Sequence, residues 1–169
     1  MRDGRKWLWL VLLVPLLFLA GCRGEQAEIT KGRYALRLYD ESFHYTREIE
    51  ALYDESGALK SLAIAFTYDS GSIQLSGKNS LGEYPDAEAS ITVLEDGSMR
   101  LSNVITARSV EAGALEDEAF RPARSLYENL KTESDAKIFW DRQLTLVAEK
   151  KIPSNENNSI IINGEAVSW

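Results

Sequence analysis

Apolar and polar residues alternate along much of the chain after Gly32, with the two-residue period of half-buried β-strands. Three segments show this alternation, and their apolar series are Tyr34, Leu36 and Leu38, then Phe43, Tyr45, Ile49 and Ala51 with Arg47 interrupting, then Leu62, Ile64, Phe66 and Tyr68. Asp-Glu-Ser at 40–42, Asp-Glu-Ser-Gly at 54–57 and Asp-Ser-Gly at 69–71 follow tyrosines at the ends of these segments. Because Asp, Ser and Gly favour turns, the pattern predicts antiparallel strands joined by short connections.

Further strands are predicted downstream. A short strand at 72–77 is followed by a loop at 78–86 that contains Asn, Gly and Pro. Strands at 89–94 and 99–107 flank Glu95-Asp96-Gly97-Ser98, and segments 160–162 and 166–169 flank Asn163-Gly164. Asp-Gly and Asn-Gly are strong hairpin signals, so each pair of segments predicts a hairpin.

One segment changes to the helical period. Apolar residues three and four positions apart predict an amphipathic helix near 116–132, namely Leu115, Ala119, Ala123, Leu126, Tyr127 and Leu130. Pro122 indicates that the regular helix begins near it, because proline is tolerated in the first turn. Segment 135–150 is ambiguous, since Ala136, Trp140, Leu144 and Val147 fit a helix face while 143–148 alternates like a strand. We favour the strand.

These elements predict a mainly β (α+β) fold, an antiparallel meander or incomplete small barrel of about six to nine strands with one helix. Residues 32–169 are enough for one domain with a single core. The polar stretch 22–31 has no apolar period and is predicted to be a tether.

The amino end has the pattern of a secretory signal. Three basic residues lie within the first six positions, and residues 7–20 are uncharged and rich in Leu and Val. As a helix this run is about 21 Å long, shorter than the ~30 Å hydrocarbon core of a membrane. Small residues then precede the single cysteine, in the order Leu19-Ala20-Gly21-Cys22.

This arrangement resembles the lipobox of bacterial prolipoproteins over the first 22 residues. The resemblance implies cleavage between Gly21 and Cys22, a diacylglyceryl group on the Cys22 thiol and acylation, for example with palmitate, of its freed amine. Two or more acyl chains anchor a protein stably in a membrane, whereas one does so only marginally. An uncleaved anchor or an ordinary secretory signal is the alternative. The sorting pattern of this family places a protein with Arg23 in the outer membrane of a diderm host, or on the outer face of the plasma membrane in a monoderm host.

Composition excludes several functions. The chain has 169 residues, with 19 basic and 26 acidic side chains, one His and one Cys. One Cys and one His cannot form a Cys/His zinc site, an iron–sulfur site or a disulfide framework. The formal charge of −7, which becomes −9 when residues 1–21 are removed, argues against nucleic-acid binding. We therefore expect no cofactor, no metal site and no nucleic-acid partner.

Candidate chemistry is sparse. His44 is the only imidazole and is predicted on a strand face shared with Thr46, Glu48 and Glu50, where a solvent-facing role is favoured over a catalytic one. Acidic groups at Glu48/Glu50, Glu95/Asp96 and Glu116/Asp117/Glu118 would suit glycoside hydrolysis only at a defined separation. The turns at 54–57 and 69–71 lack the spacing of a calcium loop. Trp140, Trp169 and the tyrosines are expected in the core or on the sheet.

The sequence thus favours a lipid-anchored bacterial cell-envelope lipoprotein with a β-rich, non-catalytic binding or interaction domain. Its expected partners are membrane lipid, through acylated Cys22, and an envelope protein or small ligand. An envelope hydrolase using carboxylates or His44, and a structural or accessory subunit of an envelope complex, remain alternatives.

Overall fold

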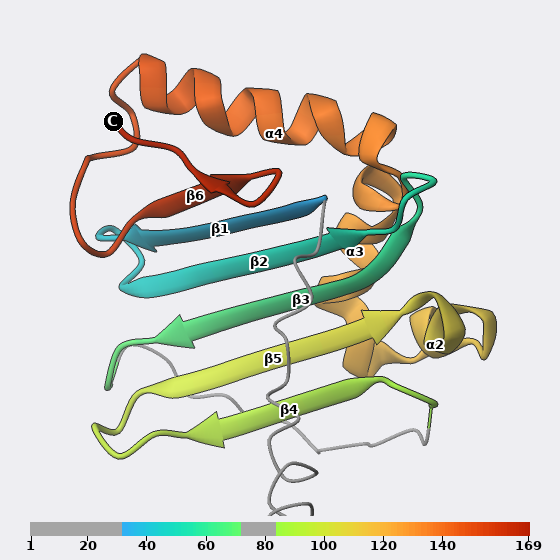
Figure 1. Ribbon diagram of the computed structural model, residues 1–169. Coiled ribbons are helices and arrows are strands. Elements are labelled where there is room, and N and C mark those ends of the chain that lie inside the picture. The colour runs from blue at the N-terminus through green and yellow to red at the C-terminus, as the bar shows by residue number, and fades with distance from the viewer. Residues whose placement is uncertain (1–31, 72–83) are drawn as a thin grey trace, which may run out of the picture.

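The computed structural model describes residues 32–71 and 84–169, which form one open antiparallel sheet with helices on one face (Figure 1). The seven strands lie in the order β4-β5-β3-β2-β1-β6-β7. Their bounds are Arg33–Asp40 for β1, Tyr45–Tyr53 for β2, Leu59–Tyr68 for β3, Glu88–Val93 for β4, Met99–Thr106 for β5, Ser159–Ile162 for β6 and Glu165–Ala166 for β7. The mainly β (α+β) prediction is confirmed, and the sheet is open and not a closed barrel.

The strand order is not that of a simple meander. β1, β2 and β3 follow one another as predicted, but β3 then pairs with β5, so that β4 lies at the outer edge of the sheet. At the opposite side, β6 from the carboxyl end pairs with β1. The predicted strand at 72–77 and most of the loop at 78–86 lie outside the described residues.

The helices follow β5. α2 (Ala107–Glu111) begins directly after the strand, two 3₁₀ turns span Ala114–Glu116 and Glu118–Phe120, and α3 (Arg121–Leu130) carries Pro122 in its first turn as expected. The predicted helix near 116–132 is therefore regular only from Arg121. α2 was not predicted, because residues 99–107 continue the strand-like pattern up to its start.

The interpretation of 135–150 as a strand is wrong. The segment forms α4 (Glu133–Ala148), with Thr132 capping its amino end by accepting a hydrogen bond from the Asp135 N–H at 3.0 Å. Ala136, Trp140 and Gln143 are buried at helical spacing. The alternation of 143–148 covers only six residues, whereas the helical spacing extends over the whole element, and the longer pattern prevails.

The core lies between the helices and one face of the sheet. This face takes alternate residues from each strand, and the helices add Phe120, Leu130 and Trp140. Its fully buried sheet residues include Leu36, Ile49, Leu62, Ile64, Ile105 and Ile160. Figure 1 shows α3 behind the sheet and α4 along its β6 side. The opposite face has no helix on it among the described residues, and we call it the open face.

The second strand begins later than predicted. Phe43 and His44 belong to the β1–β2 turn, where His44 has a φ of 52° and Phe43 is 71% exposed. Asp40 Oδ1 accepts the N–H groups of Ser42 and Phe43 at 2.9 and 3.1 Å, and this turn chemistry ends the strand pairing before Tyr45. The carboxyl-terminal hairpin is confirmed, with Asn163 and Gly164 both at positive φ, although β7 is only two residues long.

Candidate functional site

The open face carries a set of charged side chains at its centre. Strand pairing places Arg37 opposite Glu48, Glu48 opposite Ala65, and Ala65 opposite Ser102 in one row across four strands. The neighbouring row runs Ala35, Glu50, Ala63 and Val104 in the same way. Alternation in each strand aims these side chains away from the helices, because residues two apart point to the same side of a sheet.

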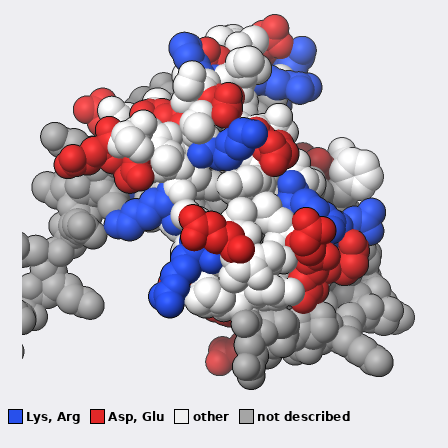
Figure 2. All heavy atoms as spheres, turned by 90° about the vertical axis from the view of Figure 1, so that its right-hand side faces the viewer, with Lys and Arg blue, Asp and Glu red and all other residues white. Residues whose placement is uncertain are grey.

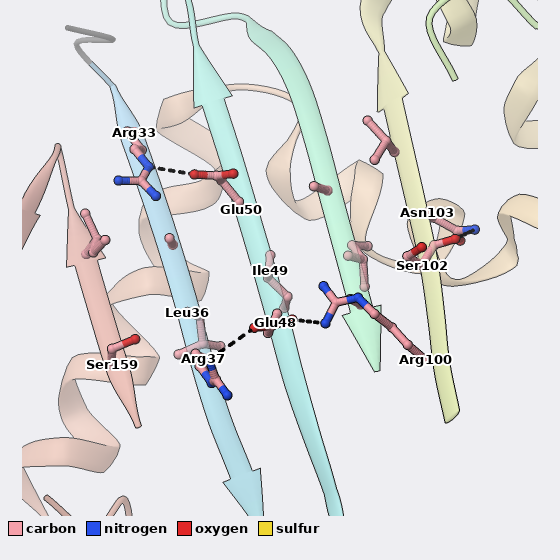
Figure 3. Close-up of a pocket in the computed structure, with 16 residues that line it drawn as sticks. Arg33, Leu36, Arg37, Glu48, Ile49, Glu50, Arg100, Ser102, Asn103 and Ser159 are labelled. Atoms are coloured by element: carbon pink, nitrogen blue, oxygen red, sulfur yellow. Dashed lines mark hydrogen bonds and ion pairs between the residues drawn. The ribbon is translucent and has the colours of Figure 1, made fainter. Parts of the chain in front are cut away.

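Five charged residues on this face form ion pairs, and we call them the open-face cluster: Arg33, Arg37, Glu48, Glu50 and Arg100 (Figure 3). Arg33 Nε lies 2.6 Å from Glu50 Oε1. Glu48 lies between two cations, with Oε2 2.6 Å from Arg100 Nη1 and Oε1 3.7 Å from Arg37 Nη1. All five side chains are 29–54% exposed, so these pairs are partly solvated and each stabilises the fold by at most about 1 kcal/mol.

A depression of about 480 Å³ lies over this cluster. Its floor includes Ala63 and Ala65 of β3, whose small side chains leave space between the longer residues of β2 and β5. Ala65 is only 4% exposed although it is on the open face. Sequence reasoning recognised Glu48 and Glu50 on one face, but it missed the arginines and the alanines between them.

The cluster differs in charge from the rest of the protein. Three arginines and two glutamates give it a formal charge of +1, whereas the whole chain carries −7. The charges are mixed at the right-hand end of the molecule in Figure 1: Figure 2 shows basic and acidic side chains interspersed on that face without a large patch of one sign. Within the cluster, guanidinium groups therefore outnumber carboxylates by one.

Within residues 32–71 and 84–169, no hydroxyl group forms a hydrogen bond with the His44 imidazole. Its Nδ1 lies 3.9 Å from Asp69 Oδ2, and its side chain is 64% exposed. Asp69 Oδ2 in turn accepts the hydroxyl hydrogen of Tyr39 at 2.6 Å. Because His44 belongs to the turn, it does not share the strand face of Thr46, Glu48 and Glu50, and that prediction is wrong.

The acidic clusters have different structural settings. Glu95 and Asp96 belong to the β4–β5 turn, where Asp96 Oδ1 accepts the Ser98 N–H and hydroxyl at 2.9 and 2.6 Å, which lowers its pKa. Asp117 accepts the Ala119 N–H at 2.9 Å. The carboxylate of Glu118 is held by Arg124 at 2.6 Å, and this hydrogen bond lowers its pKa.

The carboxylate of Asp54 accepts hydrogen bonds from the turn at 54–57 to which it belongs. Asp54 Oδ1 accepts the Ser56 hydroxyl at 2.6 Å and the Ser56 and Ala58 N–H groups at 2.8 and 3.1 Å. These hydrogen bonds, the one from the Ser56 hydroxyl first, lower the Asp54 pKa. Within residues 32–71 and 84–169, no three His, Cys, Asp or Glu side chains are grouped so that they could hold a metal ion.

The aromatic residues divide between core and sheet. Trp140 is 2% exposed and stacks on Tyr34 with ring centroids 5.5 Å apart, and Tyr34 meets Tyr53 edge-on at 5.5 Å. Burial, and then the hydrogen bond that the Tyr34 hydroxyl donates to Glu133 Oε1, raise the pKa of Tyr34 to about 12. Trp169 packs partly buried against the same core. The contacts of Trp140 with Tyr34, and of Tyr34 with Tyr53, pack α4 against the sheet.

Comparison of the chain with protein-family models, with curated proteins and with solved structures found no match. In the part that the structure describes, no helix combines the length and the apolar character needed to cross a membrane. The lipobox residues Leu19-Ala20-Gly21-Cys22 lie outside the described residues.

Proposed function

We propose that this protein is a lipid-anchored bacterial cell-envelope lipoprotein whose domain binds a ligand or partner on its open face without catalysing a reaction. The anchor is inferred from the lipobox at Cys22. The observation that carries the binding role is the open-face cluster, with its depression of about 480 Å³ on the sheet face that carries no helix from the described part of the chain.

The arrangement suits a ligand with acidic groups. Exposed ion pairs contribute little to stability, so an incoming carboxylate or phosphate replaces Glu48 or Glu50 on an arginine at small cost. Arg37 is the most available cation, since it is 54% exposed and its nearest Glu48 oxygen is 3.7 Å away. Arginine presents several N–H groups in a fixed plane and therefore binds planar anions with defined geometry.

The anchor is tested by the intact mass of the mature protein from membranes. We expect a chain that begins at Cys22 and carries acyl groups. The Cys22→Ser variant should remain unprocessed and lose stable membrane retention. Normal processing and retention of this variant would refute the anchor.

The binding surface is tested by cross-linking in intact cells with wild type and with Arg37→Glu/Arg100→Glu. We expect the charge reversal to abolish the wild-type cross-linked species. Arg108→Glu is the matched control, because Arg108 is an exposed arginine in α2, outside the open-face cluster. Equal cross-linking by both variants would refute the role of the open face.

A structural role in an envelope complex is the second candidate. Val93, at the end of edge strand β4, is 66% exposed, and the adjacent Leu94 is 37% exposed. Exposed apolar residues at an edge strand favour contact with another protein. A stoichiometric partner in pull-downs from detergent-solubilised membranes would support this role. Turnover of a glycan or ester that is lost in His44→Ala or Glu48→Gln would instead support a hydrolase.

A further inference from the structure

Arg47 is a charged residue on the helix-facing side of β2, where the neighbouring residues are apolar. Its partners across the sheet are Leu38 on β1 and Phe66 on β3, and all three side chains belong to the helix-facing side. The next two residues of β2 on this side, Ile49 and Ala51, are buried and apolar. A guanidinium beside such neighbours is costly unless it has a partner.

No acidic side chain in residues 32–71 and 84–169 pairs with Arg47, and its Nε is shut off from solvent without a hydrogen bond. Five other buried side-chain atoms of the described residues also lack a hydrogen bond, but among them Arg47 Nε alone belongs to a cation. Native proteins rarely leave such an atom without a ligand, a water or a functional reason. The arginines of the open-face cluster, by contrast, each have a carboxylate.

Arg47 lines a second depression, of about 520 Å³, between the β1–β2 end of the sheet and the connection from α4 to β6. Figure 1 shows these two segments at the left-hand end of the molecule. We call this depression the Arg47 pocket. Its apolar walls are Leu38, Tyr45, Ile152 and Pro153, and Lys151 provides a second cation.

The walls of the pocket are held in place by the chain itself. Asn158, which is 8% exposed, accepts the Tyr39 N–H at 2.9 Å and donates to the Pro153 carbonyl at 3.0 Å, which fastens the connection to β1. The Lys151 N–H donates to the Leu146 carbonyl at 2.9 Å and so closes the end of α4. The pocket is thus formed before a ligand arrives.

Two acids at the pocket limit the charge of its ligand. Asp40 Oδ1 accepts hydrogen bonds from the backbone of its own turn, and Glu41 is exposed. Lys151 forms an ion pair with Glu149 at 2.7 Å. The four charged residues that line the pocket sum to zero, and Arg47 is the lining cation that has no ion pair within the described residues. Arg47 can therefore hold one negative charge, while Asp40 and Glu41 repel a dianion.

We propose that the Arg47 pocket binds a small monocarboxylate with an apolar chain, with the carboxylate on the Arg47 guanidinium and the chain against Leu38, Ile152 and Pro153. This site is separate from the open-face cluster and does not depend on the function proposed for that face. Arginine suits the role because its N–H groups bind a carboxylate in two parallel hydrogen bonds.

The test uses the full chain in nonionic detergent micelles, with hexanoate, hexyl phosphate and hexylammonium as probes and blank micelles as the reference. Binding is measured by saturation-transfer NMR and by calorimetry. We expect hexanoate to bind more tightly than hexyl phosphate, and hexylammonium not to bind. Hexanoate binding should weaken as NaCl is added, because salt screens the charges.

The Arg47→Leu variant should weaken hexanoate binding about tenfold to a hundredfold, as expected for the loss of a charge-assisted hydrogen bond. It should fold, since leucine suits the apolar neighbours, and circular dichroism checks this. Arg47→Met provides the same test if Arg47→Leu does not fold. Arg108→Leu, which removes an exposed arginine in α2, should leave binding unchanged.

Three results would overturn the proposal: no hexanoate binding by wild type, equal binding by the folded Arg47 variants, or hexylammonium binding as tightly as hexanoate. Tighter binding of hexyl phosphate would overturn the assignment of a carboxylate and point to a phosphate headgroup. Failure of the cross-linking experiment on Arg37 and Arg100 would not affect any of these outcomes.

Discussion

Replacing Trp140 with alanine should weaken the packing of α4 on the sheet and destabilise the fold. Trp140 is 2% exposed, stacks on Tyr34 at 5.5 Å and meets Phe139 edge-on at 4.9 Å. A tryptophan buries roughly 150–250 Å², and at about 25 cal/mol per Å² this corresponds to an upper figure of about 4–6 kcal/mol. Alanine retains part of that contact, so we expect the free energy of unfolding to fall by about 3–5 kcal/mol.

The matched control is Ile138→Ala on the same helix. Ile138 is 80% exposed, so its replacement removes little buried area and should change stability by no more than about 0.5 kcal/mol. Both variants lie inside α4, which makes any difference between them a difference in packing and not in helix formation.

Urea unfolding followed by circular dichroism at 222 nm measures both variants without relying on tryptophan emission. A domain of this size is stable by about 5–15 kcal/mol, so Trp140→Ala can leave too little folded protein for a baseline. In that case Trp140→Leu, which keeps part of the apolar contact, should show a smaller loss. A cost below about 1 kcal/mol for Trp140→Ala, or equal costs for Trp140→Ala and Ile138→Ala, would refute the packing of α4 on the sheet.

Three further predictions concern turns and titratable groups. Asp54→Ala should destabilise the fold, because it removes the carboxylate that accepts the hydrogen bonds of the turn. The folded pKa of Asp54 is lowered, so the difference in unfolding free energy between wild type and variant should be largest above pH 4 and shrink as the pH falls through the folded pKa. Urea unfolding at pH 7 and pH 3 measures this difference. Gly164→Ala should lower the free energy of unfolding by about 1–2 kcal/mol in the same assay. Gly164 has a φ of +81° and open space around it, so the whole effect comes from backbone strain. An unchanged free energy of unfolding would contradict the conformation of this turn. Absorbance at 295 nm should show Tyr34 and Tyr53 ionising only near pH 12. Glu133→Gln should lower the pKa of Tyr34 more than that of Tyr53, because Glu133 accepts a hydrogen bond from Tyr34 and acts on Tyr53 only through its charge. Because both folded pKa values are raised, their contribution to stability is complete below pH 10 and is lost as the pH rises toward 12.

Local patterns predicted the strands well because each is encoded by its own residues. Tyr34, Leu36 and Leu38 do share the buried side of β1, and the Asn163-Gly164 turn adopts the positive φ values that its residues favour. The strand order could not be derived in this way, because the pairing of β1 with β6 joins residues more than 120 positions apart. Nothing in either strand alone specifies that partner.

The sites were harder to predict than the fold. Glu48 and Glu50 were placed on one face from their spacing, but the arginines that neutralise them come from β1 and β5 and meet them only through strand pairing. Arg47 was visible only as an interruption of an apolar series. The interruption was itself the signal, because a charge at a core-facing position marks either an error in the predicted face or a group with a function.

The position of β1 also limits when the protein can fold. The first strand of the described chain lies inside the sheet, between β2 and β6, and its partner residues on β6 follow more than 120 positions later in the sequence. A nascent chain still attached to the ribosome therefore exposes one hydrogen-bonding edge of β1 until residues 159–162 have been synthesised and released. Premature termination, even a few codons before Ser159, would release a molecule with that edge open to association with other chains.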